Sequence, residues 1–424
     1  MSDTRQTARV RSDGRADYGV VLRNREFVTV LVTQSLSVVG DQVARVALAL
    51  LVFQRTGSAL AASATYAVSY GSYVLGGPVL SALADRYPRR TVMVVSDLLR
   101  CVLIGLLGLD PPTPALFVLI ALAGSVAPAF TSARSATLPD VLGDGDYATG
   151  LGLVSSAAQC SQFVGFALGG VLVAGLGSRT AFLADALTFL VSAVALGLLL
   201  EHRPATGGPR PGLLREARLG AGVVRRSPAL RYWLGWGLLL SGAAAAPEGL
   251  AVAVSRAGGG GPLTAGLLTA ALPLGYVLGT FAVLRVPSER RPGILPLASA
   301  LSFGPLIVTP LSGSLPVTIA LWVLAGAGGA AQVVANGQYA LRCDPAVRGR
   351  AFGLAATALM LTQAVVLLLS GSAAGRWSPT TVVAAVGVLG LLVTLLLSRR
   401  HPDGGFSRTA PRRSRADMTG GSAT

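Results

Sequence analysis

Six ionisable side chains lie inside long apolar stretches of this 424-residue sequence. They are Asp41, Arg45, Asp97, Arg100, Asp185 and Glu248. Ionisable groups in such surroundings are costly and therefore mark functional sites by default. A carboxyl group there can take up and release a proton, and a carboxylate beside an arginine can form an ion pair. The chemistry that these residues offer is proton exchange and charge pairing.

Spacing along the chain suggests partners for four of the six. Asp41 precedes Arg45 by four residues, and Asp97 precedes Arg100 by three. Either spacing puts two side chains on one helix face, where they can form a neutralised structural bridge. We interpret Asp97 and Arg100 as such a bridge, whereas Asp41 stays open between a structural role and a role in transport.

Glu248 differs from Asp41, because the sequence places no Arg or Lys within one helical turn of it. A desolvated carboxyl without a basic neighbour on its helix can bind and release a proton, so Glu248 is the first candidate for a proton carrier. Asp41 and Asp185 are the other two candidates. The alternative for Glu248 is a carboxylate that is merely solvated near the outer surface.

Metal, cofactor and catalytic sites are not expected. The three cysteines, Cys101, Cys160 and Cys343, lack the spacing of metal ligands. Both histidines lie in polar stretches, and the chain contains no phosphate-binding loop, nucleophile elbow or zinc-protease motif. We therefore expect a protein that is not an enzyme and that needs no cofactor.

The elements that carry these residues are long and apolar. Apolar residues make up 52% of the chain and charged residues only 13%, against about 25% charged residues in a soluble protein. Twelve apolar runs approach the length of about 20 residues that crosses a bilayer. These runs are 27–53, 59–80, 91–109, 113–133, 148–176, 179–200, 232–254, 262–284, 293–311, 315–341, 351–374 and 380–397. The sequence predicts an all-α membrane protein with twelve transmembrane helices.

The arginines predict how these helices are oriented. Arginine supplies all 35 basic residues apart from histidine, and most arginines outside the runs fall in the two tails and in alternate loops. The opposite loops hold only Arg55, Arg179, Arg256 and Arg376. Because arginine-rich loops stay in the cytoplasm, we expect a multi-pass protein of the cell membrane with both termini cytoplasmic. The net charge of +16 is then a topology signal and needs no nucleic-acid partner.

A polar segment at 201–231 divides the runs into two sets of six. The predicted parts are a tail over 1–26, a half over 27–200, a linker over 201–231, a half over 232–398 and a tail over 399–424. Residues 213–226 predict an amphipathic helix, which lies either on the inner membrane surface or in solvent. The loops after the second and eighth runs each contain a proline, an acid and a terminal Arg-Arg. The two halves are therefore predicted to be repeats, as in secondary transporters.

The first of these loops reads Ser-Ala-Leu-Ala-Asp-Arg-Tyr-Pro-Arg-Arg over residues 81–90. With this motif the chain resembles the major facilitator superfamily, whose pattern is G-x-L-A-D-R-x-G-R-R, and within it the branch of macrolide and siderophore exporters. The resemblance covers nearly the whole chain and implies two six-helix halves that rock about a central cavity. It also implies a cytoplasmic gate of breakable ion pairs, here Asp85, Arg86, Arg89, Arg90 and Arg134. The alternative is that these arginines only anchor the topology.

The fifth run resembles the exporter motif of the fifth family helix, G-x8-G-x3-G-P-x2-G-G. The corresponding residues are Gly152, Ser161, Gly165, Phe166, Gly169 and Gly170. Small residues at this spacing allow two helices to pack closely. Phe166 replaces the proline whose kink the family associates with the direction of antiport.

Amides and a tyrosine are the sparse polar groups of a predicted central cavity. They are Gln34, Gln159, Gln162, Asn336, Gln338, Tyr339 and Gln363. Apolar walls with a few amides suit a lipophilic organic substrate better than a sugar or a phosphate. Hydrogen bonding between helices is the alternative role for each of these side chains.

Together these observations predict a secondary active transporter, most consistent with a proton-coupled exporter of hydrophobic organic compounds. Its expected partners are the lipid bilayer, the substrate and protons, and we expect a monomer. Basicity from arginine alone, with abundant alanine and glycine, suggests a GC-rich bacterial genome. An importer on the same fold is the main alternative, because a fold does not determine direction. A non-transporting membrane receptor is a second alternative.

Overall fold

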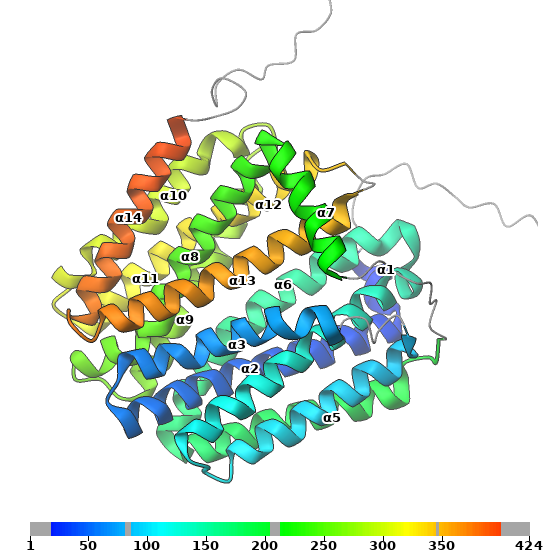
Figure 1. Ribbon diagram of the computed structural model, residues 1–424, viewed down its shortest axis with the longest axis horizontal. Coiled ribbons are helices and arrows are strands. Elements are labelled where there is room, and N and C mark those ends of the chain that lie inside the picture. The colour runs from blue at the N-terminus through cyan, green and yellow to red at the C-terminus, as the bar shows by residue number, and fades with distance from the viewer. Residues whose placement is uncertain (1–17, 81–85, 204–212, 345–346, 400–424) are drawn as a thin grey trace, which may run out of the picture. The chain divides into compact units, whose positions relative to one another are not determined.

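The computed structural model describes residues 18–80, 86–203, 213–344 and 347–399, and these ranges contain helices and no strand (Figure 1). The first half contains α1 (Tyr18–Arg23), α2 (Arg25–Thr56), α3 (Ala59–Leu80), α5 (Arg89–Leu107) and α6 (Thr113–Leu199). A second group follows with α7 (Leu213–Arg226), α8 (Pro228–Ala257), α9 (Pro262–Arg285) and α10 (Arg291–Val308). The last elements are the 3₁₀ helix η1 (Thr309–Leu311), α11 (Leu315–Gly329), α12 (Ala331–Leu341), α13 (Arg348–Ala373) and α14 (Pro379–Arg399).

Two glycines divide the 87-residue α6 into three helical segments. Gly143 has a φ of 67° and Gly177 a φ of 79°, a left-handed conformation that glycine adopts because it has no Cβ. The segments 113–142, 144–176 and 178–199 therefore follow one another without a loop. With α11 and α12 taken as one segment, the described residues contain twelve helical segments of 18 residues or more. Nine spans among the described residues are by themselves long and apolar enough to cross a membrane. The predicted all-α, twelve-helix fold is confirmed.

Helix starts follow local sequence rules. α8, α9 and α14 begin at Pro228, Pro262 and Pro379. Proline is favoured at the first helical position, where a backbone N–H has no partner within the helix. The Ser227 hydroxyl caps α8 by accepting a hydrogen bond of 3.3 Å from the N–H of Leu230.

The chain packs as two compact units. The first unit comprises residues up to 47 together with 72–209, and the second comprises 48–71 together with the chain from 210 onward. The end of α2 and the start of α3 thus pack with the second unit.

The predicted halves, 27–200 and 232–398, were defined by repeats in the sequence and not by packing. They stay a prediction. Residues 1–17, 204–212 and 400–424 of the predicted tails and linker lie outside the described residues.

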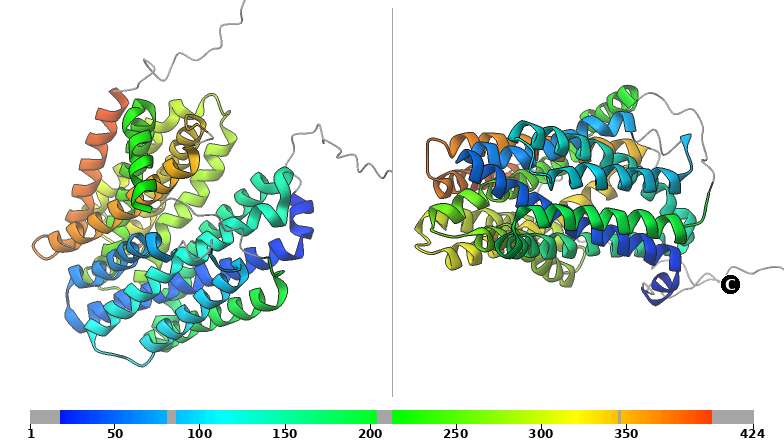
Figure 2. Two further views of the ribbon diagram at one scale, coloured as in Figure 1. Left: turned by 45° about the vertical axis from the view of Figure 1, so that its right-hand side comes forward. Right: turned by 90° about the horizontal axis from the view of Figure 1, so that it is seen from below.

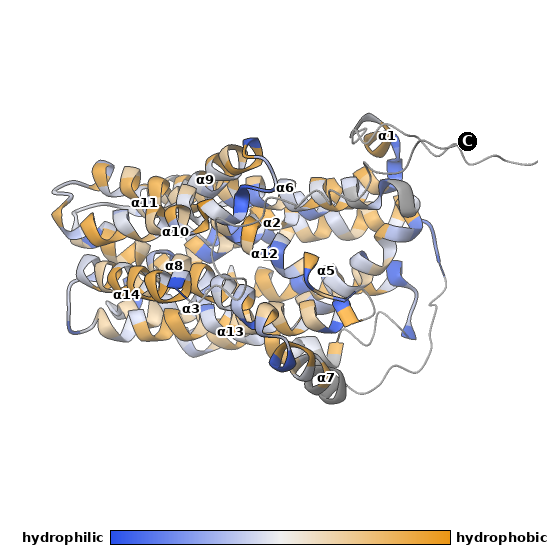
Figure 3. Ribbon diagram, turned by 90° about the horizontal axis from the view of Figure 1, so that it is seen from above, coloured by the Kyte–Doolittle hydropathy of each residue, from blue (hydrophilic) through white to orange (hydrophobic). Residues whose placement is uncertain are grey.

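The first unit is held together by an apolar cluster that includes Phe27, Met93, Phe130 and Leu196. In this unit α5 runs beside segments of α6 (Figure 2). Apolar side chains also point outward from the helices of both units, and Leu75 of α3 and Leu297 of α10 are 76% and 75% exposed. Orange, hydrophobic ribbon dominates the helices in Figure 3. Such exposed surfaces suit lipid contact, because a bilayer solvates apolar side chains.

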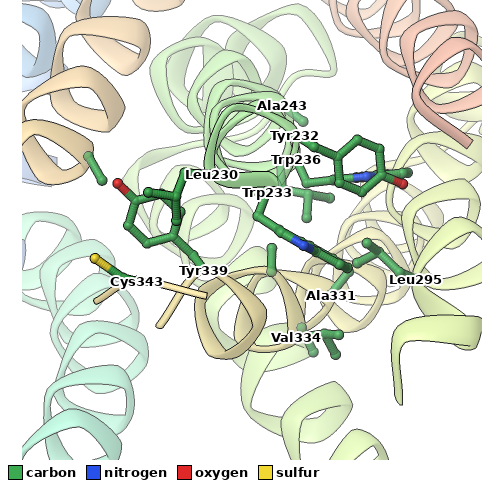
Figure 4. Close-up of a cluster of buried hydrophobic side chains, with 14 of the residues drawn as sticks. Leu230, Tyr232, Trp233, Trp236, Ala243, Leu295, Ala331, Val334, Tyr339 and Cys343 are labelled. Carbon is green, nitrogen blue, oxygen red and sulfur yellow. The ribbon is translucent and has the colours of Figure 1, made fainter. Parts of the chain in front are cut away.

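The second unit has a more aromatic core (Figure 4). Trp233 and Trp236 of α8 are 1% and 0% exposed. The Tyr232 ring meets both indoles edge to face, at centroid distances of 5.1 and 6.4 Å. Aromatic side chains bury the largest areas of any residue and dominate the stability of a core.

The predicted amphipathic helix at 213–226 is observed as α7. It packs on α13, where a Cβ at Gly220 would lie 2.8 Å from the carbonyl oxygen of Arg350. Val224 joins the aromatic cluster and is 6% exposed. Part of the apolar face of α7 therefore packs on protein, and its predicted location on the inner membrane surface or in solvent stays a prediction.

Candidate functional site

An ion pair joins α2 to α5 inside the first unit. Arg100 Nη2 lies 2.6 Å from Asp41 Oδ1 and 2.9 Å from Asp41 Oδ2. The guanidinium carbon of Arg100 lies 4.1 Å from the centroid of the Phe189 ring. Hydrogen bonds between two charged groups are the strongest of those that proteins form, and the ring adds a cation–π contact.

This pairing adds a contact to the predicted ones. Asp41 pairs with Arg100 on another helix, and Arg100 also lies within electrostatic range of Asp97. The predicted Asp41–Arg45 and Asp97–Arg100 bridges stay predictions. Spacing along one helix identifies neighbours on that helix only. It does not reveal which long arginine side chain reaches across to a neighbouring helix.

Asp97 of α5 bonds to α6 instead. Its Oδ2 accepts a hydrogen bond of 2.6 Å from the Ser192 hydroxyl. Its Oδ1 is buried and has no hydrogen-bond partner within the described residues, and the residue is 1% exposed. Asp97 therefore links α5 to the last segment of α6 and still has one unused acceptor.

Asp185 is fully enclosed, with 0% of its surface exposed. Its Oδ1 accepts a hydrogen bond of 3.3 Å from Thr188, and its Oδ2 has no such partner among the described residues. A Cβ added at Gly40 would lie 2.3 Å from Asp185 Oδ1, so this position of α2 admits only glycine without rearrangement. Asp185 lies within electrostatic range of Asp41, Arg100 and Arg45.

These five residues form what we term the charge cluster. Its members are Asp41, Arg45, Asp97, Arg100 and Asp185. The cluster holds three carboxyl groups but only two guanidinium groups. Uncompensated charge is expensive in an apolar interior. One bound proton would make the cluster electrically neutral, so the arrangement suits reversible proton binding.

Sequence reasoning missed the residues of α6 that surround this cluster. Thr188 and Ser192 supply hydrogen bonds, and Phe189 supplies the ring under Arg100. Relative to Asp185 they stand at positions i+3, i+7 and i+4. Residues at those spacings share one helix face. This pattern was the signal that could have identified them.

Glu248 lies on α8 in the second unit and is half-buried. The Tyr70 hydroxyl of α3 lies 3.3 Å from Glu248 Oε1 and 3.5 Å from Oε2 and donates to this carboxylate. The structure thus gives Glu248 a partner that the sequence did not predict. Asp41 and Asp185 come together in the first unit, whereas the described contacts of Glu248 lie in the second. Its predicted role as proton carrier stays a prediction.

The predicted cytoplasmic gate is described only in part, because Asp85 lies outside the described residues. Arg89 donates a hydrogen bond of 2.6 Å to the carbonyl oxygen of Ala136 and pairs with Asp140. Arg90 donates one of 3.1 Å to the carbonyl oxygen of Leu200. These arginines bind the beginning of α5 to two segments of α6. Asp140 follows Pro139 near the end of the first segment of α6, and the sequence of the second half has a comparable pair at Asp344-Pro345.

For the other two predicted gate arginines, Arg86 and Arg134, the described contacts show no such bond to α6. Arg86 is exposed. Arg134 is partly buried near Tyr73, and its Nε has no hydrogen-bond partner within the described residues. In the equivalent loop of the second half, Glu289 bonds with its own backbone N–H and the Ser288 hydroxyl, which lowers the pKa of its carboxyl. That loop therefore carries an ionised acid, while the gate role of both loops stays a prediction.

Small residues bring the middle segment of α6 against α2. A Cβ at Gly165 would lie 2.6 Å from the carbonyl oxygen of Val39, and a Cβ at Gly169 would lie 3.1 Å from Val43 Cα. Gly152 has no described atom within 4 Å of such a Cβ. The remaining three motif positions, Ser161, Phe166 and Gly170, are buried.

Most amides proposed to line a cavity already bond to protein. Gln162 donates to Gln159 at 3.1 Å, and Gln363 donates to Ser241 at 2.7 Å. The other pairs are Gln332 with Asn336, Arg342 with Gln338 and the Tyr339 hydroxyl with the Ala351 carbonyl. The buried Oε1 of Gln34 has no hydrogen-bond partner among the described residues. These bonds fit helix-to-helix contacts, and the cavity role stays a prediction.

Comparison with known families and proteins gives a consistent result. The model of the Major Facilitator Superfamily matches residues 30–254. The chain is 25% identical over 411 residues to the enterobactin exporter EntS of Escherichia coli (strain K12), covering 92% of this chain and 95% of EntS. It is 27% identical to the multidrug efflux pump Tap of Mycolicibacterium fortuitum, over 68% of this chain and 74% of Tap.

A third relative is matched over a shorter region. Identity to the uncharacterized MFS-type transporter YfiS of Bacillus subtilis (strain 168) is 26%, over 50% of this chain, and the match spans about half the length of YfiS, 52%. Among solved structures, a POT family transporter in complex with a thioalcohol-conjugated peptide superposes with a TM-score of 0.70. Its sequence is 12% identical, with 91% of this chain and 97% of that chain covered, which supports the fold alone.

Proposed function

Because the chain belongs to the major facilitator superfamily, we propose that it is a proton-coupled exporter of hydrophobic organic compounds. Family membership makes it a multi-pass membrane transporter of small molecules and not an enzyme. Export is supported by the relatives EntS and Tap, which are named as an exporter and an efflux pump. Those names describe the relatives, and the substrate of this chain is part of our proposal.

Proton coupling is supported above all by the charge cluster, which has one carboxyl group more than it has arginines. Asp41 accepts hydrogen bonds from Arg100, so its carboxylate already has a partner. Asp185 is wholly enclosed and has an oxygen without a hydrogen-bond partner in the described chain. We therefore assign the exchangeable proton to Asp185.

Loss of this proton would rearrange the cluster. An ionised Asp185 would compete with Asp41 for Arg100, since both acids lie within electrostatic range of that guanidinium. Movement of Arg100 toward α6 would loosen the contact between α2 and α5. Proton release is thereby coupled to helix packing, as secondary transport requires.

A lipophilic substrate is supported by the apolar character of the helices, whose candidate polar groups are a few amides and a tyrosine. Gln363, Gln162 and Tyr339 already donate hydrogen bonds to protein acceptors. A sugar or a phosphate would need more polar groups than apolar walls with a few amides supply. Apolar contact is then the main source of substrate affinity.

The direction of transport can be tested by growth. An efflux-deficient bacterial host that expresses the chain should tolerate higher concentrations of some lipophilic inhibitors than the same host with an empty vector. Increased sensitivity to the same compounds would instead indicate import and overturn export. Expression must be matched, because membrane overproduction alone slows growth.

Asp185→Asn tests the proton site in liposomes that contain purified protein. With a lipophilic fluorescent dye as probe, the variant should lose accumulation driven by a pH gradient but keep dye-for-dye exchange, which needs no net proton movement. Asp110→Asn is the matched control, because Asp110 is an exposed acid in the turn after α5. Unchanged pH-driven accumulation by Asp185→Asn would remove Asp185 as the carrier and leave Asp41 and Glu248.

The orientation is also proposed. The arginine distribution supports a bacterial cell-membrane protein with both termini cytoplasmic, and we propose that it acts as a monomer. Reporter fusions at Met1, at the 201–231 segment and at Thr424 should all report the cytoplasm. A single reporter active outside the cell would contradict this topology.

A further inference from the structure

Arginines gather at the junction of α7, α8, α12 and α13 within the second unit. The stretches 213–231 and 338–354 contain eight arginines and only two acids, Glu216 and Asp344. The structure describes the side chains of six of these arginines, and all six are exposed. We term them the arginine patch, and its members are Arg225, Arg226, Arg231, Arg342, Arg348 and Arg350.

Contacts between the four helices hold these arginines at one end of the unit. Gly220 of α7 packs against the carbonyl oxygen of Arg350 in α13. Arg348 Nη2 lies 3.5 Å from a backbone carbonyl oxygen near the end of α12. The guanidinium carbon of Arg342 lies 5.2 Å from the centroid of the Trp233 ring, near the beginning of α8. A single residue separates α7 from α8, so the last turn of α7 stays beside these contacts (Figure 1).

Three of these arginines lie where a positive charge destabilises its own helix. Arg231 is in the first turn of α8, and Arg348 and Arg350 are in the first turn of α13. The helix dipole places its positive end there, so basic side chains are unfavourable. Neither of these two described helices has an acid in its first turn. Like charges within the patch also repel one another. A bound anion would relieve both effects.

The helix α7 has one face on protein and another that is uncovered by the described chain. Gly220 and Val224, four residues apart, lie on the face that packs on protein. Leu219 and Arg226, seven residues apart, share another face, and both are exposed, Leu219 by 42%. Exposed leucine beside arginine on an amphipathic helix suits the boundary between the headgroups and acyl chains of an anionic membrane.

We propose that the arginine patch binds the phosphate headgroups of anionic phospholipids in the inner leaflet, with the uncovered face of α7 lying in the membrane surface. A guanidinium group fits a phosphate because two parallel N–H donors reach two of its oxygens. Clusters of about four to eight basic residues beside a membrane helix are typical of such sites. The choice of leaflet rests on the proposed cytoplasmic location of residues 201–231. Headgroup binding itself does not depend on the substrate, on proton coupling or on the direction of transport.

A lipid titration measures this binding. Purified full-length protein in a neutral detergent is mixed with increasing amounts of dioleoyl phosphatidylglycerol, and the thermal midpoint of unfolding is recorded. Phosphatidylglycerol should raise the midpoint, because a ligand that binds the folded state stabilises it. The zwitterionic dioleoyl phosphatidylcholine should not raise it at the same mole fraction. Equal rises with the two lipids would overturn the proposal, since the acyl chains alone would then explain the effect.

Arg225→Gln/Arg226→Gln removes two charges of the patch. Each arginine strengthens attraction to an anionic lipid surface about fivefold, so the half-maximal phosphatidylglycerol concentration should rise about thirtyfold. Arg256→Gln/Arg376→Gln is the matched control, because both arginines are exposed in the same unit and Arg256 lies at the opposite end of α8. Equal titrations for the two double variants would overturn the patch as the binding site. If the first variant fails to fold, Arg231→Gln provides the same test with an expected rise of about fivefold.

Inorganic phosphate distinguishes a lipid headgroup from a soluble anion. At the same concentration of phosphate groups it should leave the thermal midpoint unchanged, because it lacks acyl chains that hold it at the membrane surface. A rise as large as the one with phosphatidylglycerol would make the patch a site for a soluble anion and overturn the lipid assignment. These titrations contain no substrate and no pH gradient, so a failed Asp185→Asn test would leave their outcome unaffected.

A fluorophore on α7 tests whether its uncovered face enters the membrane. In a background in which Cys101, Cys160 and Cys343 are replaced by serine, Leu219→Cys is labelled with an environment-sensitive maleimide dye. The emission should lie at shorter wavelength in phosphatidylglycerol liposomes than in phosphatidylcholine liposomes. Trp377→Cys is the control, since Trp377 is 60% exposed and lies outside the patch, and its dye should not distinguish the two lipids. Equal emission of the Leu219→Cys dye in both lipids would overturn the membrane contact of α7.

Discussion

The two units bury different chemistry behind corresponding helices. In the first unit, α2 carries Asp41, which pairs with Arg100 across to α5. In the second, α8 is the repeat counterpart of α2, and it buries Trp233 and Trp236. Glu248, the acid of α8, accepts a hydrogen bond from a tyrosine. Acids on equivalent helices of a repeat can therefore have different roles, because one is paired with a guanidinium and the other with a neutral hydroxyl.

This contrast has an energetic side. A buried ion pair is costly to break, since the remaining partner keeps an uncompensated charge. Truncating a buried aromatic side chain also costs about 3–5 kcal/mol, but it leaves no uncompensated charge. We therefore expect single substitutions in the charge cluster to affect stability and transport together, and polar substitutions in the second unit to affect stability alone.

Arg100→Leu should give the largest effect. It leaves the partly buried Asp41 without its guanidinium. Breaking a fully buried pair costs about 3–5 kcal/mol, so we expect a loss of stability toward the lower end of that range. The thermal midpoint in detergent and the yield should both fall. The double variant Asp41→Leu/Arg100→Leu, which removes both charges, should recover much of that stability. A single variant as stable as the double would show that the pair is not buried enough to matter.

Gly40→Ala in the first unit and Gly390→Ala in the second should destabilise the protein by similar amounts, which allows their effects on transport to be compared. The new Cβ would lie 2.3 Å from Asp185 Oδ1 at position 40 and 2.1 Å from Phe303 Cε1 at position 390. Overpacking of this kind costs about 1–3 kcal/mol. Only Gly40→Ala should also shift the pH dependence of transport. Equal pH profiles for the two variants would argue against Asp185 as the proton site.

Gln363→Leu should have a smaller effect. It removes the hydrogen bond to Ser241, and such bonds between membrane helices contribute about 0.6 kcal/mol, up to about 1.7. Ser241→Ala should lower the stability by the same amount, and the double variant should be little less stable than either single variant. The range of exported compounds should not change. A changed range with unchanged stability would instead support the predicted contact between Gln363 and the substrate.

Arg342→Leu should have the smallest effect of the four. The guanidinium carbon lies 5.2 Å from the Trp233 ring, and the side chain is exposed. An exposed cation–π contact contributes about 0.5–1 kcal/mol. Arg342→Lys should retain most of it. A loss as large as that of Arg100→Leu would remove the energetic distinction between the two units.

The fold followed from the sequence because apolar runs of membrane length leave few alternatives. The fifth and sixth runs, for example, were separated around Gly177, where the structure shows the break between two segments of α6. In a bilayer every backbone group must bond internally, so an apolar run of that length has to be a helix. The same argument says nothing about how one helix packs on another.

The site was predicted less completely for that reason. Asp41, Asp185 and Arg100 were identified from their apolar surroundings, but the contact between Arg100 and Asp41 depends on the rotation of α2 and α5 about their axes. Tyr70 was not identified, because a tyrosine in an apolar helix gives no signal of its own. Only packing shows that its hydroxyl reaches Glu248.

The glycine breaks in α6 have a mechanical consequence. At Gly177 two membrane-spanning segments follow each other with a single residue between them, and Gly143 joins the preceding pair in the same way. A connection of one residue has no slack, so neither segment can slide or tilt far without pulling on the next. The three segments of α6 should therefore shift together, while each glycine still allows the angle between two segments to change. A displacement of Asp185 on the last segment would therefore also displace Arg134 on the first, because the backbone connections transmit the movement without a chain of side-chain contacts.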